Sequence, residues 1–374
     1  MTELLPTSAA ELAEMIQAAT APLSLRGGAT RGMEALGQAL SVAGIRGVTL
    51  YEPGAMTLVC AAGTPMDEIE TLLAGENQQL AFEPIDHRAL LGTSGTPTIG
   101  GVIAANVSGP RRIQAGAARD SVIGLRFVDG MGRQIHNGGR VMKNVTGYDL
   151  ARLVAGSRGT LGAITEVALR VLPAPEAVAT LRIEVASADA AVEALSAALG
   201  SPFDVTGAAY VPGQGALVRL EGFAPSVRYR AEELTRTLAR FGAVSVEDDA
   251  RLCRQIWRDL RDASPFHAAP GDVWRVSVKP SDAPEIAARL EADNVFFDWG
   301  GGLIWALMPE GSDLRARLGD FSGHATLVRA SQATKAIIPT LQPEPAALAL
   351  LSEKLKAQFD PRGLFSARQQ RHAA

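Results

Sequence analysis

The sequence predicts an α+β fold divided between two domains, and three observations support this. The chain has 374 residues, which is too long for one ordinary hydrophobic core. Short strands, helices and glycine-rich turns alternate up to Pro173 and Pro175, which mark a boundary. From about residue 177 a strand–helix–strand–strand–helix–strand order occurs twice, and each occurrence resembles a ferredoxin-like unit.

Composition excludes several classes of protein. The chain is 47% hydrophobic and 20% charged, as in soluble globular proteins, and its net charge of -4 gives no indication of nucleic-acid binding. Two cysteines, Cys60 and Cys253, are too few for a disulfide framework or a cysteine-ligated cluster within the chain. The start is acidic where a signal peptide is basic, and no apolar run is long enough for a direct membrane span. We therefore expect a cytoplasmic protein.

The elements of the first domain follow from local signals. Ser8 and Glu11 form a capping box ahead of an apolar helical stripe, so a helix is expected there. Thr64 is a candidate N-cap, followed by Pro65 at the first helical position. Alternating apolar residues and turn signals predict the remaining elements. These are a strand leading into Leu25, strands at Val48–Tyr51 and Met56–Ala61, a helix at Met66–Leu73, and strands through Val128, at Gln134–His136 and at Ala163–Leu172.

The second domain is predicted from the repeated pattern alone. The first repeat comprises Leu181–Ala186, Ala188–Leu199, Val205–Val211, Ala216–Gly222, Val227–Phe241 and Ala243–Val246. The second comprises Val273–Val278, Ala283–Ala292, Val295–Trp299, Leu303–Met308, Asp313–Leu318 and Ala325–Arg329. The segment Asp248–Leu260 joins them, and a last helix is expected at Glu344–Gln358.

A stretch of small residues, Gly92 to Gly109, is the strongest indication of a binding site. It contains five glycines with hydroxyl side chains between them, a composition that suits a backbone bending closely around a ligand. Amide groups exposed at such bends bind anions, phosphates above all. A flexible linker has a similar composition. However, the apolar residues Ile99, Val102 and Ile103 indicate that this stretch belongs to a packed domain.

A second candidate turn contains Gly27 and Gly28, which follow a predicted strand. Arg26 precedes these glycines and Thr30 and Arg31 follow them, so the turn suits a pyrophosphate, although an ordinary turn would look the same. In the second domain, Trp299 precedes three glycines. Core packing is the default role of a tryptophan, whereas an aromatic side chain beside bare backbone could also form the wall of a cleft.

Other familiar chemistries leave no trace in the sequence. There is no G-x-G-x-x-G turn between a strand and a helix, no lysine follows a glycine as in a Walker A loop, and no G-x-S-x-G elbow occurs. The five histidines lack the spacing of metal ligands, so we expect no metal site.

Several motifs together resemble a known family. Arg26-Gly27-Gly28-Ala29-Thr30, Thr98-Ile99-Gly100-Gly101, Arg119-Asp120 and Gly159–Glu166 resemble the FAD-binding domain of the vanillyl-alcohol oxidase, or PCMH, type. The segments Val141–Asp149 and Asp298-Trp299-Gly300-Gly301 more narrowly resemble the smaller FAD-binding subunits of bacterial glycolate oxidases.

The resemblance implies an α+β fold in which a PCMH-type FAD-binding domain of two α/β subdomains precedes a cap of antiparallel sheet. The FAD-binding domain would cover residues 1–173, with subdomains of about 1–52 and 53–173. The cap, with its ferredoxin-like repeats, would cover 174–342, and residues 343–374 would return to the FAD-binding domain. The tail after Asp360 lacks the family's Asn-Pro-Gly.

The resemblance also implies the cofactor-binding residues. Backbone amides of both glycine turns would hold the FAD pyrophosphate, hydroxyl groups would add hydrogen bonds, and Gly162–Thr165 would run along the ribityl chain or flavin edge. The expected residues are Arg26, Gly27, Gly28, Ala29, Thr30, Ser94, Gly95, Thr96, Thr98, Ile99, Gly100, Gly101, Asp120, Gly162, Ala163, Ile164 and Thr165. Ala29 and Thr30 stand where covalent flavoproteins of the family carry histidine, so FAD is expected to bind non-covalently.

In this family the subunit works with a larger FAD-binding subunit and an iron–sulfur subunit, and the complex oxidises a small 2-hydroxy acid, glycolate, to glyoxylate. Membrane contact would come only through these partners. Lys143, Tyr148 and Arg329 are the candidates for substrate contact, but the histidine-rich motif of related dehydrogenases is absent from the cap. The subunit is therefore either an active dehydrogenase or a flavin-carrying electron-transfer or structural subunit. A stand-alone flavin reductase using NAD(P)H is a third alternative.

Overall fold

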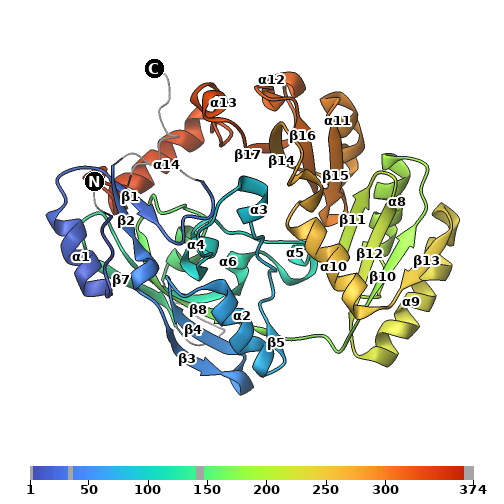
Figure 1. The fold of residues 1–374 in the computed structure, drawn as a ribbon, viewed down its shortest axis with the longest axis horizontal. Helices are drawn as coiled ribbons and strands as arrows, with labels where there is room; N and C mark the ends of the chain where they lie inside the picture. The colour runs from blue at the N-terminus through green and yellow to red at the C-terminus, as the bar shows by residue number, and fades with distance from the viewer. Residues whose placement is uncertain (1–2, 33–36, 140–146, 366–374) are drawn as a thin grey trace. The chain divides into compact units, whose positions relative to one another are not determined.

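The computed structural model describes residues 3–32, 37–139 and 147–365. They form two compact units, and Figure 1 traces each along the chain. Unit 1 comprises Met1–Ser108, Gly116–Ala174 and Glu344–Ala374, and unit 2 comprises Gly109–Ala115 and Pro175–Pro343. The segment Gly109–Ala115 thus packs with unit 2, although the sequence prediction placed it in the first domain.

Unit 1 is built on an antiparallel sheet of five strands in the order β3-β4-β8-β6-β7. Its strands are β3 (Val48–Glu52), β4 (Thr57–Ala61), β8 (Ala163–Arg170), β6 (Val122–Val128) and β7 (Gln134–Gly138). The N-terminal strand β1 (Leu23–Arg26) pairs in parallel with β2 (Gln38–Ser41) in a separate sheet, and β5 (Gln78–Gln79) pairs with β9 (Leu172–Pro173). The first glycine turn therefore leaves the end of a parallel strand.

The first helix of unit 1, α1 (Ala9–Ala18), begins at the expected cap, because the Ser8 hydroxyl accepts a hydrogen bond from the Glu11 amide. It buries Leu12 and Ile16, the predicted stripe. The unit's other helices are α2 (Met66–Gly75), α3 (Arg88–Leu91), α4 (Ile99–Ala104), α6 (Ala118–Ser121), α7 (Leu150–Val154) and α14 (Ala346–Phe359). Short 3-10 turns occur at Val42–Gly44 and Pro53–Ala55.

Unit 2 contains one antiparallel sheet of eight strands in the order β13-β10-β12-β11-β15-β16-β14-β17. The strands are β10 (Ala177–Ile183), β11 (Gly207–Val211), β12 (Gly215–Gly222), β13 (Val244–Glu247), β14 (Asp272–Val278), β15 (Asn294–Asp298), β16 (Leu303–Met308) and β17 (Gly323–Arg329). Numbered within each repeat, both halves have the strand order 4-1-3-2 of a ferredoxin-like unit. The predicted pair of repeats is therefore confirmed.

The two repeats join through their second strands, where Tyr210 of β11 pairs with Phe297 of β15 and their rings lie 5.5 Å apart. Two buried clusters, one for each repeat, pack the helices against the sheet. The helices of unit 2 are α5 (Arg112–Ala115), α8 (Ala188–Leu199), α9 (Ala224–Leu238), α10 (Ala250–Arg261), α11 (Ala283–Leu290), α12 (Leu314–Leu318) and α13 (Gln332–Ile337). Further 3-10 turns occur at Ala239–Phe241, Ser264–Phe266, Pro280–Asp282 and Trp299–Gly301.

The end of the described chain is anchored to unit 1 by a buried carboxylate. Asp360 accepts hydrogen bonds from the amides of Leu364 and Phe365 and from Lys356 Nζ, each at 2.8 Å. Lys356 also donates to the carbonyl of Thr160 at 3.2 Å. The Leu23 amide donates to the Leu364 carbonyl, so this tail lies beside β1 (Figure 1). Within the described ranges, no helix combines the length and apolarity that a membrane span requires.

Candidate functional site

The two glycine turns that the sequence singles out lie against each other in unit 1. A side-chain carbon at Gly28 would lie 1.4 Å from the carbonyl oxygen of Thr96, and one at Gly95 would lie 1.8 Å from the carbonyl oxygen of Gly28. Neither distance is possible for a real side chain, so both positions require glycine. The hydroxyl of Thr93 also donates to the carbonyl of Thr30 at 2.8 Å. The two predicted turns are therefore in direct contact, backbone against backbone.

Helix α4 (Ile99–Ala104) begins immediately after the second turn. The hydroxyl of Thr98 caps it by accepting a hydrogen bond from the Gly101 amide. Gly100 packs against Ala62, where an added side-chain carbon would lie 2.6 Å from the alanine Cβ. The Gly100 amide donates to the Ala62 carbonyl, and the Ala62 amide donates to the Thr165 carbonyl. Thr165, from the third predicted segment, is therefore joined to the glycine turns through Ala62.

The third predicted segment, Gly162–Thr165, enters the central strand β8. Gly162 packs on Phe127, where an added side-chain carbon would lie 2.7 Å from the ring. Ala163, Ile164 and Thr165 are all buried. The backbone of this segment therefore forms part of a rigid sheet.

Two arginines add positive charge beside these turns. Arg31 follows the first turn and donates from Nη1 to the Gly101 carbonyl, and Arg158 lies in the loop before β8. Burial, together with the charge of Arg158, lowers the pKa of Arg31 to about 10, and burial also lowers the pKa of Arg158. Sequence reasoning noted Arg31 beside the first turn but overlooked Arg158, which is flanked by Ser157 and Gly159.

Other predicted residues have local roles that the structure makes visible. Asp120 accepts a hydrogen bond from the Ala117 amide at 2.8 Å and lies 3.9 Å from Arg152. Arg26 donates from Nε to the Ser24 hydroxyl at 3.4 Å, at the end of β1. Ser94 is exposed, so its hydroxyl is accessible to a ligand.

The three candidates for substrate contact do not form a cluster that can be described. Lys143 lies outside the described residues. The side chain of Tyr148, in unit 1, is exposed. Arg329, in unit 2, donates to the main-chain carbonyls of Phe266 and Ala269, at 2.6 Å each, and of Gly271. Its guanidinium group thus holds the segment 266–271 in place.

Trp299 is buried between two guanidinium groups of unit 2. The Cζ atoms of Arg112 and Arg275 each lie 4.8 Å from its ring centroid, a cation–π geometry. Its indole Nε1 donates to the carbonyl of Gly109 at 3.1 Å. The tryptophan therefore fastens the inserted segment Gly109–Ala115 to the sheet of unit 2.

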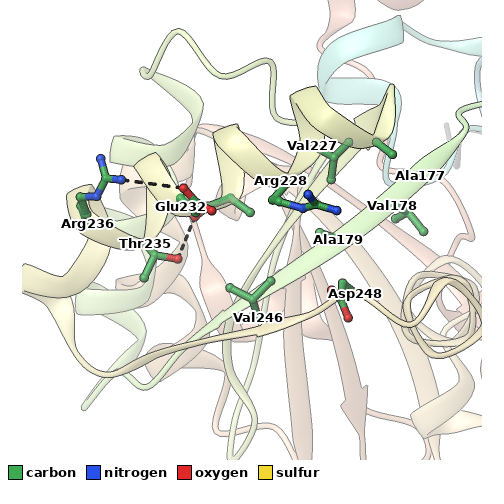
Figure 2. Close-up of a pocket in the computed structure, with 12 residues that line it drawn as sticks. Ala177, Val178, Ala179, Val227, Arg228, Glu232, Thr235, Arg236, Val246 and Asp248 are labelled. Atoms are coloured by element: carbon green, nitrogen blue, oxygen red, sulfur yellow. Dashed lines mark hydrogen bonds and ion pairs between the residues drawn. The ribbon is translucent and has the colours of Figure 1, made fainter.

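Figure 2 shows a groove in unit 2 between α9 and the strands β10 and β13. It has a volume of about 610 Å³ and contains none of the predicted site residues. Small apolar side chains, such as Ala179 and Val227, form its floor, whereas Arg228, Glu232 and Asp248 lie at its rim. It contains none of the glycine turns of unit 1.

The unit 1 site suits a phosphorylated ligand. Two adjoining glycine turns lie beside the half-buried Arg31 and Arg158. The Nε of Arg31 and the hydroxyl of Ser157 are buried donors with no hydrogen-bond partner among the described residues. Donors of this kind fit a phosphate anion. Residues 3–138 match the FAD binding domain family. The fold and the site therefore define a flavoprotein with a PCMH-type FAD-binding domain, whose cofactor is FAD.

Known proteins of similar sequence narrow this class. The glycolate oxidase subunit GlcE of Escherichia coli (strain K12) is 34% identical over 350 residues, which cover 92% of this chain and 91% of that protein. The chain belongs to this family of glycolate oxidase subunits. The glycolate oxidase subunit GlcD of Bacillus subtilis (strain 168) is 46% identical over 99 residues, which cover 26% of this chain and 21% of that protein.

Similarity to a solved structure extends to the whole fold. Alkyldihydroxyacetonephosphate synthase superposes with a TM-score of 0.71 at 16% identity, and the match covers 97% of this chain and 76% of that one. At this identity the similarity concerns the fold alone.

Proposed function

We propose that this chain is an FAD-binding subunit of a glycolate oxidase complex, which oxidises glycolate, a small 2-hydroxy acid, to glyoxylate. The observation that carries the proposal is the similarity to the E. coli GlcE subunit along nearly the full length of both chains. The paired glycine turns of unit 1 support it, because they supply the backbone surface that a dinucleotide requires. The proposed partners are a larger FAD-binding subunit and an iron–sulfur subunit.

Within that complex the chain's own residues hold the cofactor. We infer that the turns at Gly27–Thr30 and Ser94–Gly101 bind the FAD pyrophosphate, while Gly162–Thr165 lines the ribityl chain or the flavin edge. The bound flavin would supply the redox chemistry by accepting and passing on electrons. The absence of histidine from the first turn supports non-covalent binding. Precipitating the purified protein with acid should release all of its flavin into the supernatant.

The residues available for proton transfer indicate which subunit of the complex oxidises the substrate. Oxidising a 2-hydroxy acid requires a base for the hydroxyl proton. Among the described residues of unit 2, the histidines are His267 and His324. Nε2 of His267 lies 2.9 Å from the carbonyl oxygen of Asp262, and the pKa of His324 lies below its ordinary value. Because the cap lacks the histidine-rich motif of the related dehydrogenases, we propose that this subunit carries flavin and electrons, and that the larger partner oxidises the substrate.

Anaerobic mixing with glycolate tests both parts of this proposal. The isolated, FAD-loaded chain should keep its visible flavin absorption when glycolate is added, whereas the same flavin should bleach in the assembled complex. Rapid bleaching in the isolated chain would instead make it a dehydrogenase in its own right. A purified chain that is colourless and takes up no added FAD would contradict the whole proposal.

A further inference from the structure

Arg31 and Arg158 lie far apart in sequence, yet the same short helix holds both. Arg31 Nη1 donates to the carbonyl of Gly101, inside α4. The Arg158 amide donates to the carbonyl of Ala104, the last residue of α4, at 2.7 Å. The turn that carries Arg158 also packs on β1, because an added side-chain carbon at Gly159 would lie 3.4 Å from Leu25. Both arginines therefore lie beside the strand and helix that bear the two glycine turns.

The pair is electrostatically unfavourable without a ligand. Burial removes each guanidinium group from water, and the charge of Arg158 acts on Arg31, which lowers the pKa of Arg31 to about 10. Within the described residues, neither arginine forms an ion pair with a carboxylate. Two partly buried cations that lack an acid among the described residues are expected to attract an anion from outside the chain.

Unused hydrogen-bond donors occur at both arginine loops. The Nε of Arg31 is buried and has no partner among the described residues, and the same holds for the hydroxyl of Ser157, next to Arg158. Buried polar groups in folded proteins are normally satisfied, so such atoms require an explanation. A guanidinium Nε and a hydroxyl are both suited to donating to phosphate oxygens.

The backbone of Arg158 is also unusual. Its φ is 56°, in the left-handed region that glycine and asparagine tolerate better than a long side chain. Glycines stand close by in this loop, at Gly156 and Gly159, so the strained conformation is occupied by an arginine in a segment that otherwise uses glycine. Strained residues often cluster at ligand sites, and Arg158 lies just before the predicted cofactor-binding segment Gly162–Thr165.

We propose that Arg31 and Arg158 form a cationic pair that binds the diphosphate of FAD, with the Ser157 hydroxyl as an additional donor. This inference rests on the proposed function, since it presupposes that unit 1 binds FAD. It adds side-chain charge to the uncharged glycine turns. Guanidinium groups match phosphate oxygens through paired donors, and two of them offset the negative charge of the diphosphate.

The test titrates the FAD-free, full-length chain with FAD and follows the flavin fluorescence. The variants are Arg31→Met and Arg158→Asn, where asparagine suits the left-handed backbone. Each should raise the Kd for FAD about tenfold or more, the loss expected for one charged hydrogen bond. Arg31→Lys should recover part of the affinity because it restores a charge. Arg46→Gln, which removes the same charge from an exposed position, should bind FAD like the unaltered chain.

Ligands that lack parts of FAD show whether the two arginines contact the diphosphate or the flavin ring. ADP carries the diphosphate without the flavin, and riboflavin carries the ring without phosphate. ADP should compete with FAD for the unaltered chain and lose affinity in both variants, whereas weak riboflavin binding should not change. If riboflavin affinity falls as much as ADP affinity, the arginines contact the ring and the proposal is wrong.

The melting temperature provides a readout that is independent of activity. Without FAD, Arg158→Asn should melt no lower than the unaltered chain, because a strained and repelled charge has been removed. Its increase on adding FAD should nevertheless be smaller. Variants that bind FAD with unaltered affinity would overturn the proposal while leaving the proposed function intact. An unaltered chain that binds no FAD would instead overturn the proposed function, and this inference with it.

Discussion

Each unit of the molecule shields a group of arginines from solvent, fully in unit 2 and partly in unit 1, but the two groups have different partners. In unit 2, Glu221 serves both Arg111, at 2.7 Å, and Arg219, at 3.5 Å, and all three side chains are nearly inaccessible to solvent. In unit 1, Arg31 and Arg158 have no such acid among the described residues. The chain itself neutralises the first group, which is therefore structural. The second group is poised for a negatively charged ligand, and variants of each group should therefore change stability in opposite directions.

The largest effect is expected for Glu221→Gln. This substitution keeps the size of the side chain but leaves Arg111 and Arg219 without their shared charge in a buried place. Removing one side of a buried ion pair costs about 3–5 kcal/mol, so the free energy of unfolding of unit 2 should fall by roughly 3 kcal/mol. Urea denaturation followed by tryptophan fluorescence measures this loss, since all four tryptophans belong to unit 2. Glu232→Gln, at an exposed pair, should change it by less than about 0.5 kcal/mol.

A smaller loss of stability is expected for Lys356→Met in unit 1, because Lys356 forms an ion pair with a buried carboxylate. Lys356 Nζ lies 2.8 Å from Asp360, whose side chain is fully buried. Asp360 would keep its two amide hydrogen bonds, so we expect a loss of about 2 kcal/mol, below the usual cost of a broken buried pair. Denaturation in urea and faster proteolysis after residue 356 would both report it. The exposed Lys354→Met is the matched control, and equal stabilities of the two variants would contradict the prediction.

A substitution at Arg158 should raise the free energy of unfolding, whereas the two substitutions above lower it. In the FAD-free chain, Arg158→Asn removes a buried charge that has no acid and relieves a left-handed backbone, so unit 1 should gain up to about 1 kcal/mol. Thermal unfolding of the FAD-free protein measures the gain. A loss comparable to that of Lys356→Met would mean that Arg158 is structural, and the contrast between the two groups would disappear.

Much of unit 2 could be predicted from the sequence because each repeat is a local pattern of strand and helix periods. The helix Ala188–Leu199 and the strand Leu303–Met308 occur at the predicted residues. The join between the repeats was not predicted. It depends on one pairing, between Tyr210 and Phe297, and no local signal specifies which edge strands meet.

Unit 1 shows where local signals fail. Thr64 was expected to cap α2, but its hydroxyl instead donates to the carbonyl of Ala61 at 2.7 Å and accepts from the amide of Gly47. Pro65 occupies the cap position and makes no side-chain hydrogen bond there. The prediction was wrong because a tertiary contact with residues before β3 competed for the hydroxyl.

The glycine turns of the site were predictable because a run of small residues is visible in the sequence itself. The proximity of Arg31 and Arg158 was not, since 126 residues separate them and their segments come together through tertiary contacts with α4. The one available signal was the Ser-Arg-Gly sequence at 157–159, which places an arginine in a loop of otherwise small residues. Charges in glycine-rich loops therefore merit as much attention as the glycines.

The smallest predicted effect concerns a third group of positive charges, around His324 in unit 2. Partial burial, together with the charges of Arg275 and Arg112, lowers the pKa of His324 below its ordinary value. A base whose pKa is lower in the folded chain stabilises the fold fully above the unfolded value of about 6.5, and this stabilisation is lost as the pH falls through the folded pKa.

The unaltered chain should therefore lose more stability between pH 8 and pH 5 than His324→Gln, which cannot take up the proton. Urea midpoints at the two pH values measure the difference. It should be small because the His324 side chain, although partly shielded, stays largely accessible to solvent, which screens the charges of the two arginines. His136→Gln, at an exposed position in unit 1, is the control and should keep the full decline. Parallel declines in all three proteins would mean that Arg275 and Arg112 do not oppose protonation of His324.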